Sequence, residues 1–133
     1  MMPMIKRIDM IENSHLDERG WVTNPLEVIG VSGNALNNLH IASIQPGCIR
    51  GNHYHTHATE WLLIFGGAAR FFWRSMEEEN IHEEWIKGSA PVLFEIPPGI
   101  EHAVINRSEN EIFLMAFRNI ADADTIQSPI VKK

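Results

Sequence analysis

The chain has 133 residues, of which 44% are hydrophobic and 21% charged, and its formal net charge is −6 at pH 7. This length and composition predict one folded domain over residues 1–133 and exclude an intrinsically disordered chain. The acidic balance argues against binding to nucleic acid or to an anionic membrane, although a small anionic substrate can still enter a locally basic pocket.

Short runs of β-branched, aromatic and aliphatic residues recur along the chain, separated by turn sequences such as QPG, FGG, PPG and NRSEN. The expected strands are residues 21–28, 39–44, 60–65, 68–73, 82–86, 91–96, 103–106 and 112–117. Strands at this spacing, with no amphipathic helix between them, predict an all-β fold, either an antiparallel sandwich or a barrel.

Three segments fall outside this pattern. Residues 1–14 are mixed in character and are expected to be an extra edge strand or an arm that reaches a second copy of the chain. Residues 77–80, in the acidic run EEEN, are expected to be the exposed tip of a hairpin. Residues 121–133 are expected to be a peripheral tail with a short helical turn.

The sequence also bears on location. Residues 1–15 contain no apolar run followed by a small-residue cleavage site, and the apolar run at 61–69 is too short to span a membrane. Cys48 is the only cysteine, so an intrachain disulfide is excluded. We therefore expect a cytoplasmic protein.

The segment RGNHYHTHATEW, residues 50–61, places three of the seven histidines within five positions. His53 and His55 stand two residues apart, so their side chains project to the same face of a strand. A hairpin through the following residues would return Glu60 beside them. Downstream, a rigid Pro-Pro-Gly turn precedes His102. Three imidazoles and one carboxylate converging in a barrel mouth predict a transition-metal site, the alternative being a polar mouth that binds no ion.

Other polar residues near these motifs are weaker candidates. His57 lies in the connection before Glu60, where it can serve as a proton shuttle or as an ordinary surface residue. Glu101, next to His102, is a candidate acid–base group at the rim. Arg50 is a candidate for binding a phosphate or carboxylate of the substrate. Arg70 and Arg118 are weaker candidates for the same role. Tyr54, between two inward histidines, is expected to face away from the site.

These motifs resemble those of the cupin superfamily in order and spacing. The first cupin motif is matched by Gly47, His53, His55, Glu60 and Gly67, and the second by Pro97, Gly99, His102 and Asn106. One departure is that the glycine expected six residues before Pro97 is Pro91 here. The resemblance implies a small antiparallel double-stranded β-helix, the jelly-roll or cupin barrel. It also implies that His53, His55, Glu60 and His102 are metal ligands.

A further resemblance covers most of the chain. The runs DERGW (17–21), QPGCIRGNHYH (45–55), TEWLLI (59–64) and EIPPGIEHAVIN (95–106) are similar to the cupin domain of bacterial capsular-polysaccharide enzymes. In that family the domain is fused to a nucleotide-sugar reductase and has zinc-dependent C3-epimerase activity. The resemblance implies a zinc cofactor and a nucleotide-sugar substrate whose keto form is supplied by another enzyme. The DERG run also resembles metal-free nucleotide-sugar ketoisomerases of the same barrel class.

Three functions agree with this site. In a sugar epimerase or isomerase, a divalent ion stabilises an enediolate while His57, Glu101 or a hydroxide on the ion acts as the base. The same ligand set also accepts iron, nickel or manganese, which would suit a dioxygenase. The third function is a cupin that binds a small ligand without catalysis. Because cupins are commonly dimeric, we expect a homodimer in each case.

Overall fold

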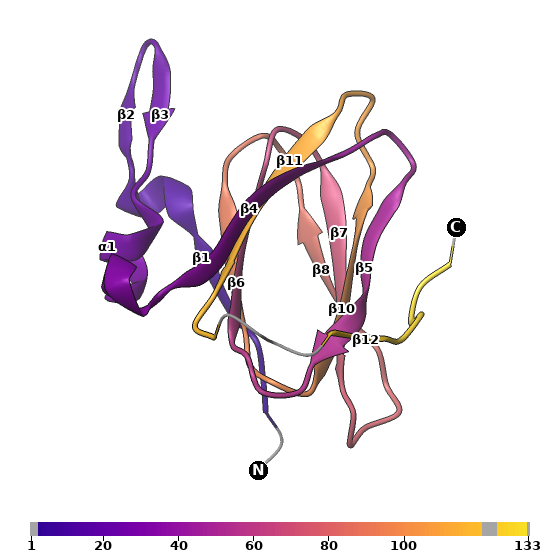
Figure 1. Cartoon of the computed structure of the whole chain (residues 1–133). Helices are drawn as coiled ribbons and strands as arrows, with labels where there is room; N and C mark the ends of the chain where they lie inside the picture. Colours follow the sequence, from indigo (N-terminus) through magenta and orange to yellow (C-terminus); the bar gives the residue numbers. More distant parts are fainter. Residues whose placement is uncertain (1–2, 121–124, 133) are drawn as a thin grey trace.

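A computed structural model describes residues 3–120 and 125–132 of the chain. Two five-stranded antiparallel sheets face each other as the walls of a barrel, and a two-stranded hairpin stands apart from them (Figure 1). The first sheet has the strand order β1-β9-β6-β11-β4 and the second β12-β5-β10-β7-β8, so strands from distant parts of the sequence lie side by side. The expected all-β antiparallel barrel is confirmed.

The elements of the first sheet are β1 (Lys6–Asp9), β4 (Asn37–Ile44), β6 (Glu60–Phe65), β9 (Val92–Ile96) and β11 (Ile112–Arg118). Those of the second sheet are β5 (Ile49–His55), β7 (Ala69–Ser75), β8 (His82–Ile86), β10 (Ile100–Asn106) and β12 (Thr125–Gln127). The separate hairpin and the short helical pieces are β2 (His15–Asp17), β3 (Gly20–Val22), α1 (Pro25–Ile29), η1 (Met10–Asn13) and η2 (Gly33–Ala35).

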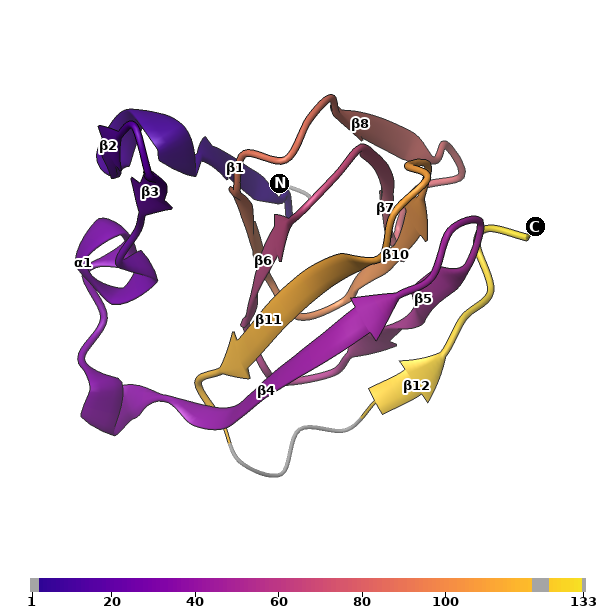
Figure 2. The same cartoon turned by 90° about the horizontal axis from the view of Figure 1, so that it is seen from above.

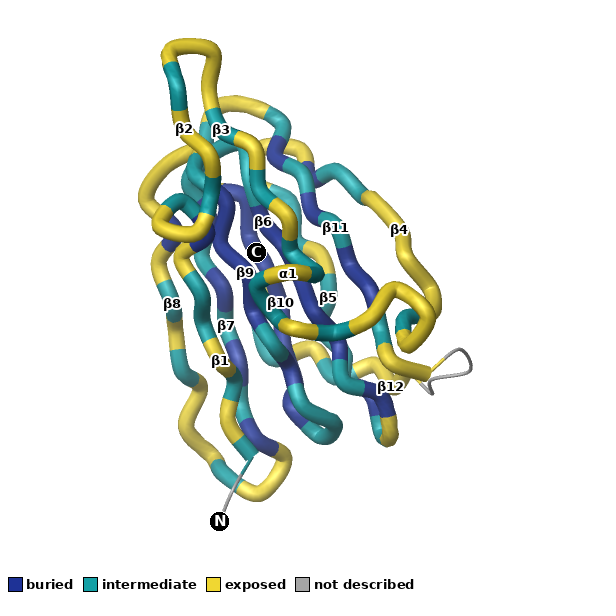
Figure 3. The backbone as a smooth tube through the Cα atoms, turned by 90° about the vertical axis from the view of Figure 1, so that its left-hand side faces the viewer, coloured by how far each residue is buried: buried dark blue, intermediate teal, exposed yellow. Residues whose placement is uncertain are grey.

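The core lies between the two sheets and follows the alternation of the strands. In β7 every second residue is buried, beginning at Ala69, because side chains on a strand point alternately to the two faces. Phe71 of β7 stacks on Phe94 of β9 with ring centroids 4.0 Å apart, so this pair joins the two sheets. The buried residues concentrate in the central strands, whereas the β2–β3 hairpin is largely exposed (Figure 3).

A second apolar cluster covers the outer face of the first sheet. Trp61, Leu63, Leu93 and Phe117 are buried there under the N-terminal segment, which contributes Met10. Figure 2 shows this segment and α1 lying outside the barrel on the side of β6. The barrel therefore has one sheet covered on both faces, which explains why β6 is apolar along nearly its whole length.

The predicted strand over residues 21–28 is wrong. β3 ends at Val22, and α1 occupies Pro25–Ile29. The side chain of Asn24 accepts a hydrogen bond from the backbone N–H of Glu27, and Gly30 ends the helix in the left-handed conformation. An asparagine before a proline and a glycine after five apolar-rich residues are start and stop signals of a helix. Here these signals prevail over the β-propensity of the segment.

The two ends of the chain both add edge strands. β1 pairs with β9 in the first sheet. Residues 125–127, expected in a peripheral tail, form β12 and pair with β5, the strand that carries His53 and His55. The part of the expected tail at residues 121–124 and 133 lies outside the described residues. The hairpin tip expected at residues 77–80 lies between β7 and β8, as predicted.

Within the described ranges, no helix has the length and apolar character that a bilayer span requires.

Candidate functional site

The four predicted metal ligands come from three strands and meet at one place. β5 and β10 pair antiparallel with His53 directly opposite His102, and Glu60 is the first residue of β6 in the facing sheet. One ligand atom from each of His53, His55, Glu60 and His102 can be chosen so that all lie within 4.8 Å of one another. The structure thus brings together the residues that the sequence motifs place fifty positions apart.

Two glycines shape the backbone around these histidines. Gly51 has a φ of 94°, and a Cβ atom at this position would lie 2.8 Å from the carbonyl oxygen of His102. The close approach coincides with a shift of register between His102 and Ala103 in the β5–β10 pair. Gly99, with a φ of 79°, donates its N–H to the carbonyl of His55 at 2.8 Å. The Pro-Pro-Gly turn is therefore tied to the strand that carries the first two histidines.

Glu60 is the centre of the cluster. Its Oε2 atom lies 3.1 Å from Nε2 of His55 and accepts a hydrogen bond from Nε of Arg118 at 2.9 Å. Burial by itself would raise the pKa of Glu60, but the contacts with His102 and His55 outweigh it and hold the pKa well below its usual range. Glu60 is therefore an anion inside the barrel, partly neutralised by one guanidinium.

The two buried histidines are oriented by their Nδ1 atoms. His102 donates from Nδ1 to the carbonyl of Ile100 at 3.0 Å, because a carbonyl can only accept. His55 has its Nδ1 3.1 Å from the hydroxyl of Thr125 on β12. A partner on Nδ1 leaves Nε2 available as a ligand atom, which is the usual arrangement around metal-bound histidines.

The donor set fits a transition-metal ion. Nε2 of His102 is buried and makes no hydrogen bond to a described residue, although it lies 3.3 Å from Glu60 Oε1. Buried polar atoms seldom lack a partner, and an ion at this place would provide one. Burial, together with the charge that His102 carries when protonated, lowers the pKa of His53 to about 4. His53 is therefore neutral at pH 7, which is the form that binds a metal.

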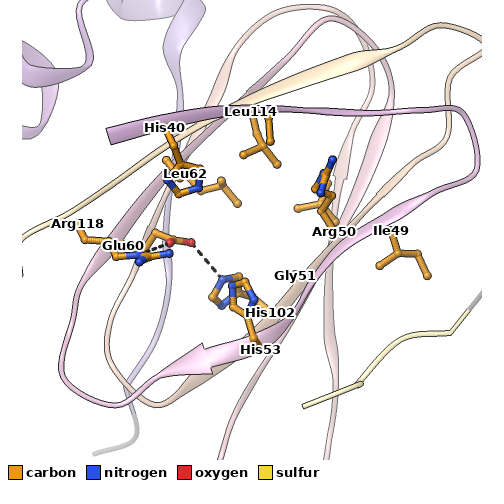
Figure 4. Close-up of a pocket in the computed structure, with 13 residues that line it drawn as sticks. His40, Ile49, Arg50, Gly51, His53, Glu60, Leu62, His102, Leu114 and Arg118 are labelled. Carbon is orange, nitrogen blue, oxygen red and sulfur yellow. Dashed lines mark hydrogen bonds and ion pairs between the residues drawn. The ribbon is translucent and has the colours of Figure 1, made fainter. Parts of the chain in front are cut away.

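The cluster lies at the wall of a pocket of about 440 Å³ (Figure 4). Its polar lining consists of His40, Arg50, His53, Glu60, His102 and Arg118, and its apolar lining includes Ala42, Ile49, Leu62, Val104, Leu114 and Ala116. His55 does not line the pocket; it is buried and contacts Glu60. A small molecule in this pocket would meet the guanidinium groups of Arg50 and Arg118 and the cluster at the same time.

Of the weaker candidates, Arg50 lines the pocket, whereas His57 and Glu101 lie outside it. Nε of Arg50 donates to the carbonyl of Ser43 at 2.8 Å. His57 is exposed in the β5–β6 turn with its Nδ1 2.9 Å from the Thr56 hydroxyl, and it does not line the pocket. Glu101 is buried elsewhere, where it accepts a hydrogen bond from Nε of Arg74 at 2.6 Å and another from the Ser128 hydroxyl.

The structure adds two residues that sequence reasoning missed or ranked low. Arg118, a weak anion-binding candidate from sequence, is the partner of Glu60. His40 on β4, which belongs to neither sequence motif, also lines the pocket. Alternation was the available signal, because His40 and Ala42 share a strand face with the buried Ile44. Tyr54, expected to face away from the site, does not line the pocket. It pairs with Ile126 of β12.

Acid should destabilise the metal-free protein through His53. Its pKa is about 4 in the fold and about 6.5 when unfolded, so the unfolded chain binds the proton first as the pH falls. The free energy of unfolding should decline between about pH 6.5 and about pH 4, by on the order of 2 kcal/mol after allowance for partial exposure. Glu60, whose pKa is also lowered, should add a loss below about pH 4.5.

Urea denaturation in the presence of a chelator, at a series of pH values, measures this loss. The His53→Gln variant is the matched control, since its side chain does not titrate and its stability should decline less over the same interval. Equal pH profiles for the two proteins would contradict the assignment of the loss to His53.

The chain is similar in sequence and in structure to parts of longer known proteins. The chain is 29% identical over 105 residues to the UDP-2-acetamido-2,6-beta-L-arabino-hexul-4-ose reductase of Pseudomonas aeruginosa, a match that covers 79% of this chain and 27% of that protein. The capsular polysaccharide assembling protein CapF from Staphylococcus aureus superposes with a TM-score of 0.63 at 23% identity, over 69% of this chain and 26% of CapF. This chain therefore spans about a quarter of the length of either protein.

The 3,4-ketoisomerase QdtA from Thermoanaerobacterium thermosaccharolyticum, solved in complex with TDP, superposes with a TM-score of 0.69 at 18% identity. That match covers 96% of this chain and 90% of QdtA, and it confirms the cupin-type barrel. The sequence profile of the polysaccharide biosynthesis C-terminal domain matches residues 15–126, which is most of the chain. This chain, a cupin-type barrel with a largely buried cluster of three histidines and one glutamate, belongs to the polysaccharide biosynthesis C-terminal domain family.

Proposed function

We propose that this protein is a metal-dependent epimerase or isomerase that acts on a nucleotide-activated keto-sugar. The observation that carries the proposal is the cluster of His53, His55, Glu60 and His102 at the wall of a pocket that also contains two arginines. The names of similar proteins support the substrate class, since they include a nucleotide-sugar reductase and a ketoisomerase bound to TDP.

In this reaction, different residues would hold the metal ion, position the Glu60 carboxylate and bind the substrate phosphates. His53, His55, Glu60 and His102 would hold a divalent ion, zinc by family resemblance, which when bound supplies a Lewis acid for the negative charge that develops on a keto oxygen. Arg118 fixes the Glu60 carboxylate through its 2.9 Å hydrogen bond. Arg50, exposed at the pocket mouth, would bind the anionic phosphates of the substrate.

The reaction needs no net oxidation. Removal of a proton from the carbon next to the keto group leaves an enediolate, and return of a proton to the other face of that carbon inverts the centre. Return to the neighbouring carbon with transfer of the hydroxyl proton exchanges the positions of the keto and hydroxyl groups. Substrate and product have the same composition in both cases. The apolar walls of the pocket would exclude bulk water from the charged intermediate.

Hydrogen exchange with the solvent tests the proposal directly. Zinc-loaded protein should introduce deuterium from heavy water next to the keto group of at least one member of a panel of TDP- and UDP-linked keto-sugars, as followed by NMR and mass spectrometry. Removal of the metal with a chelator should stop the exchange, and readdition should restore it. No exchange across the panel would overturn the proposal. Oxygen consumption by the iron-loaded but not the zinc-loaded protein would support a dioxygenase instead.

We also propose that the protein is a homodimer. β4 is an edge strand of the first sheet, and its Leu39 and Ile41 side chains are 65% and 70% exposed. An edge strand with exposed apolar residues is a favourable site for pairing with a second copy. Sedimentation velocity at micromolar concentration would show a monomer if the proposal is wrong.

A further inference from the structure

His40 is the one pocket-lining histidine, among the described residues, that does not belong to the metal-binding cluster. It lies on β4 opposite Ala116 of β11, on an edge strand of the first sheet. Figure 4 shows its ring projecting from β4 into the space above Glu60, on the side of the pocket away from His53 and His102. A molecule in the pocket would therefore lie between His40 and the cluster.

The chemistry of the other lining groups leaves His40 as the candidate for proton transfer. His53, Glu60 and His102 belong to the cluster, and their lone pairs are committed when an ion is bound. The other polar lining residues are Arg50 and Arg118, and a guanidinium group is a hydrogen-bond donor that cannot accept a proton. Imidazole is the side chain that most readily gains and loses a proton near neutrality.

A contact with the local backbone sets which nitrogen of the His40 ring carries the proton. Nδ1 of His40 lies 3.3 Å from the carbonyl oxygen of Asn38, which can only accept, so Nδ1 carries the proton. Nε2 of the neutral ring then has the free lone pair. Asn38 has a φ of 53°, in the left-handed region where asparagine is favoured among non-glycine residues, and its carbonyl is the one that His40 contacts. His40 is exposed at the pocket mouth, where solvent can exchange its proton.

We propose that His40 is the catalytic base, an inference that rests on the proposed function and deepens it. Nε2 takes the proton from the carbon next to the keto group, and the electron pair of that C–H bond forms the carbon–carbon double bond of the enediolate. The negative charge goes to the former keto oxygen, on the side of the cluster. His40 then gives its proton to water at the mouth, and the enediolate regains one proton on carbon from the solvent.

Two variants test the role of His40. His40→Ala and His40→Gln should lower kcat for solvent deuterium exchange by about 100-fold or more, with KM changed by less than about 3-fold. Metal content by elemental analysis should equal that of the wild type, because His40 is not a ligand. Added imidazole should restore part of the activity of His40→Ala but not of His40→Gln, where the larger side chain fills the space.

His15→Ala is the matched comparison, since His15 is also an exposed histidine but lies outside the pocket. We expect its kcat to stay within about 2-fold of the wild-type value. Exchange by the wild type and by His40→Ala at equal rates would overturn the assignment of His40 while leaving the proposed function intact. Absence of exchange by the wild type across the panel would overturn both. A loss of activity in His57→Ala alone would assign the base to His57 instead.

Discussion

Replacement of both His53 and His102 by alanine is expected to abolish metal binding. The two residues face each other across the β5–β10 pair, with ring centroids 4.8 Å apart, and supply half of the donor set. What remains is His55 and Glu60, whose Nε2 and Oε2 atoms lie 3.1 Å apart and already contact each other. Because the loss of a single supporting group commonly costs 10- to 100-fold in metal affinity, the loss of two ligands should cost more than about 100-fold.

Elemental analysis of protein purified without an affinity tag or added metal measures this effect, and it also identifies the metal. A double variant with His15 and His57 replaced by alanine is the control, because both histidines are exposed and lie outside the cluster. The control should keep the metal content of the wild type. Unchanged metal content in the His53→Ala, His102→Ala variant would refute the metal site, and circular dichroism would show whether the barrel is retained.

The second large effect is expected for Gly51→Ala. A Cβ atom at Gly51 would lie 2.8 Å from the carbonyl oxygen of His102 and 3.1 Å from Cα of Ala103, both of which are backbone atoms that cannot move aside. The φ of 94° adds strain for any residue with a side chain. We expect the free energy of unfolding to fall by about 2–4 kcal/mol. Metal affinity should fall as well, because the separation of β5 and β10 sets the distance between His53 and His102.

Substitutions at two other glycines separate the effect of the steric clash from the effect of backbone strain. Gly47→Ala meets nothing within 4 Å but has a φ of 77°, so it should cost about 1 kcal/mol from backbone strain alone. Gly88→Ala has open space and no positive φ, so its effect should stay within about 0.5 kcal/mol. Urea denaturation of the three variants gives the comparison. A Gly51→Ala variant no less stable than Gly47→Ala would show that the strands can separate without cost.

Several expectations from sequence depend on local signals and agree with the structure. His53 and His55 are both directed to the barrel interior because strand alternation is a property of the backbone itself. The turn before His102 is specified by its own prolines and glycine. The helix in place of a strand at residues 25–29 also has a local cause, because Asn24 and Gly30 are capping residues whose effect exceeds the β-propensity of the segment. These two residues are sequence signals from which the helix can be predicted.

Other features depend on pairings between distant segments. Thr125 contacts His55 only because β12 joins the edge of β5, seventy residues earlier in the chain. Arg118 contacts Glu60 only because β11 and β6 are neighbours in register. Glu101, adjacent to His102 in sequence, is directed to Arg74 rather than to the pocket. Strand order and register arise from long-range packing, which short sequence patterns do not encode.

The all-β class and the identity and order of the four cluster residues could be predicted from the amino-acid sequence, because spacing along a strand and turn chemistry act over a few bonds. The side chains that share the pocket with that cluster could be identified only from the folded structure. It placed His40 and Arg118 in the pocket and His57 outside it. The physical reason is that a pocket is bounded by both sheets, so its lining depends on how β4, β5, β6, β10 and β11 are arranged around it.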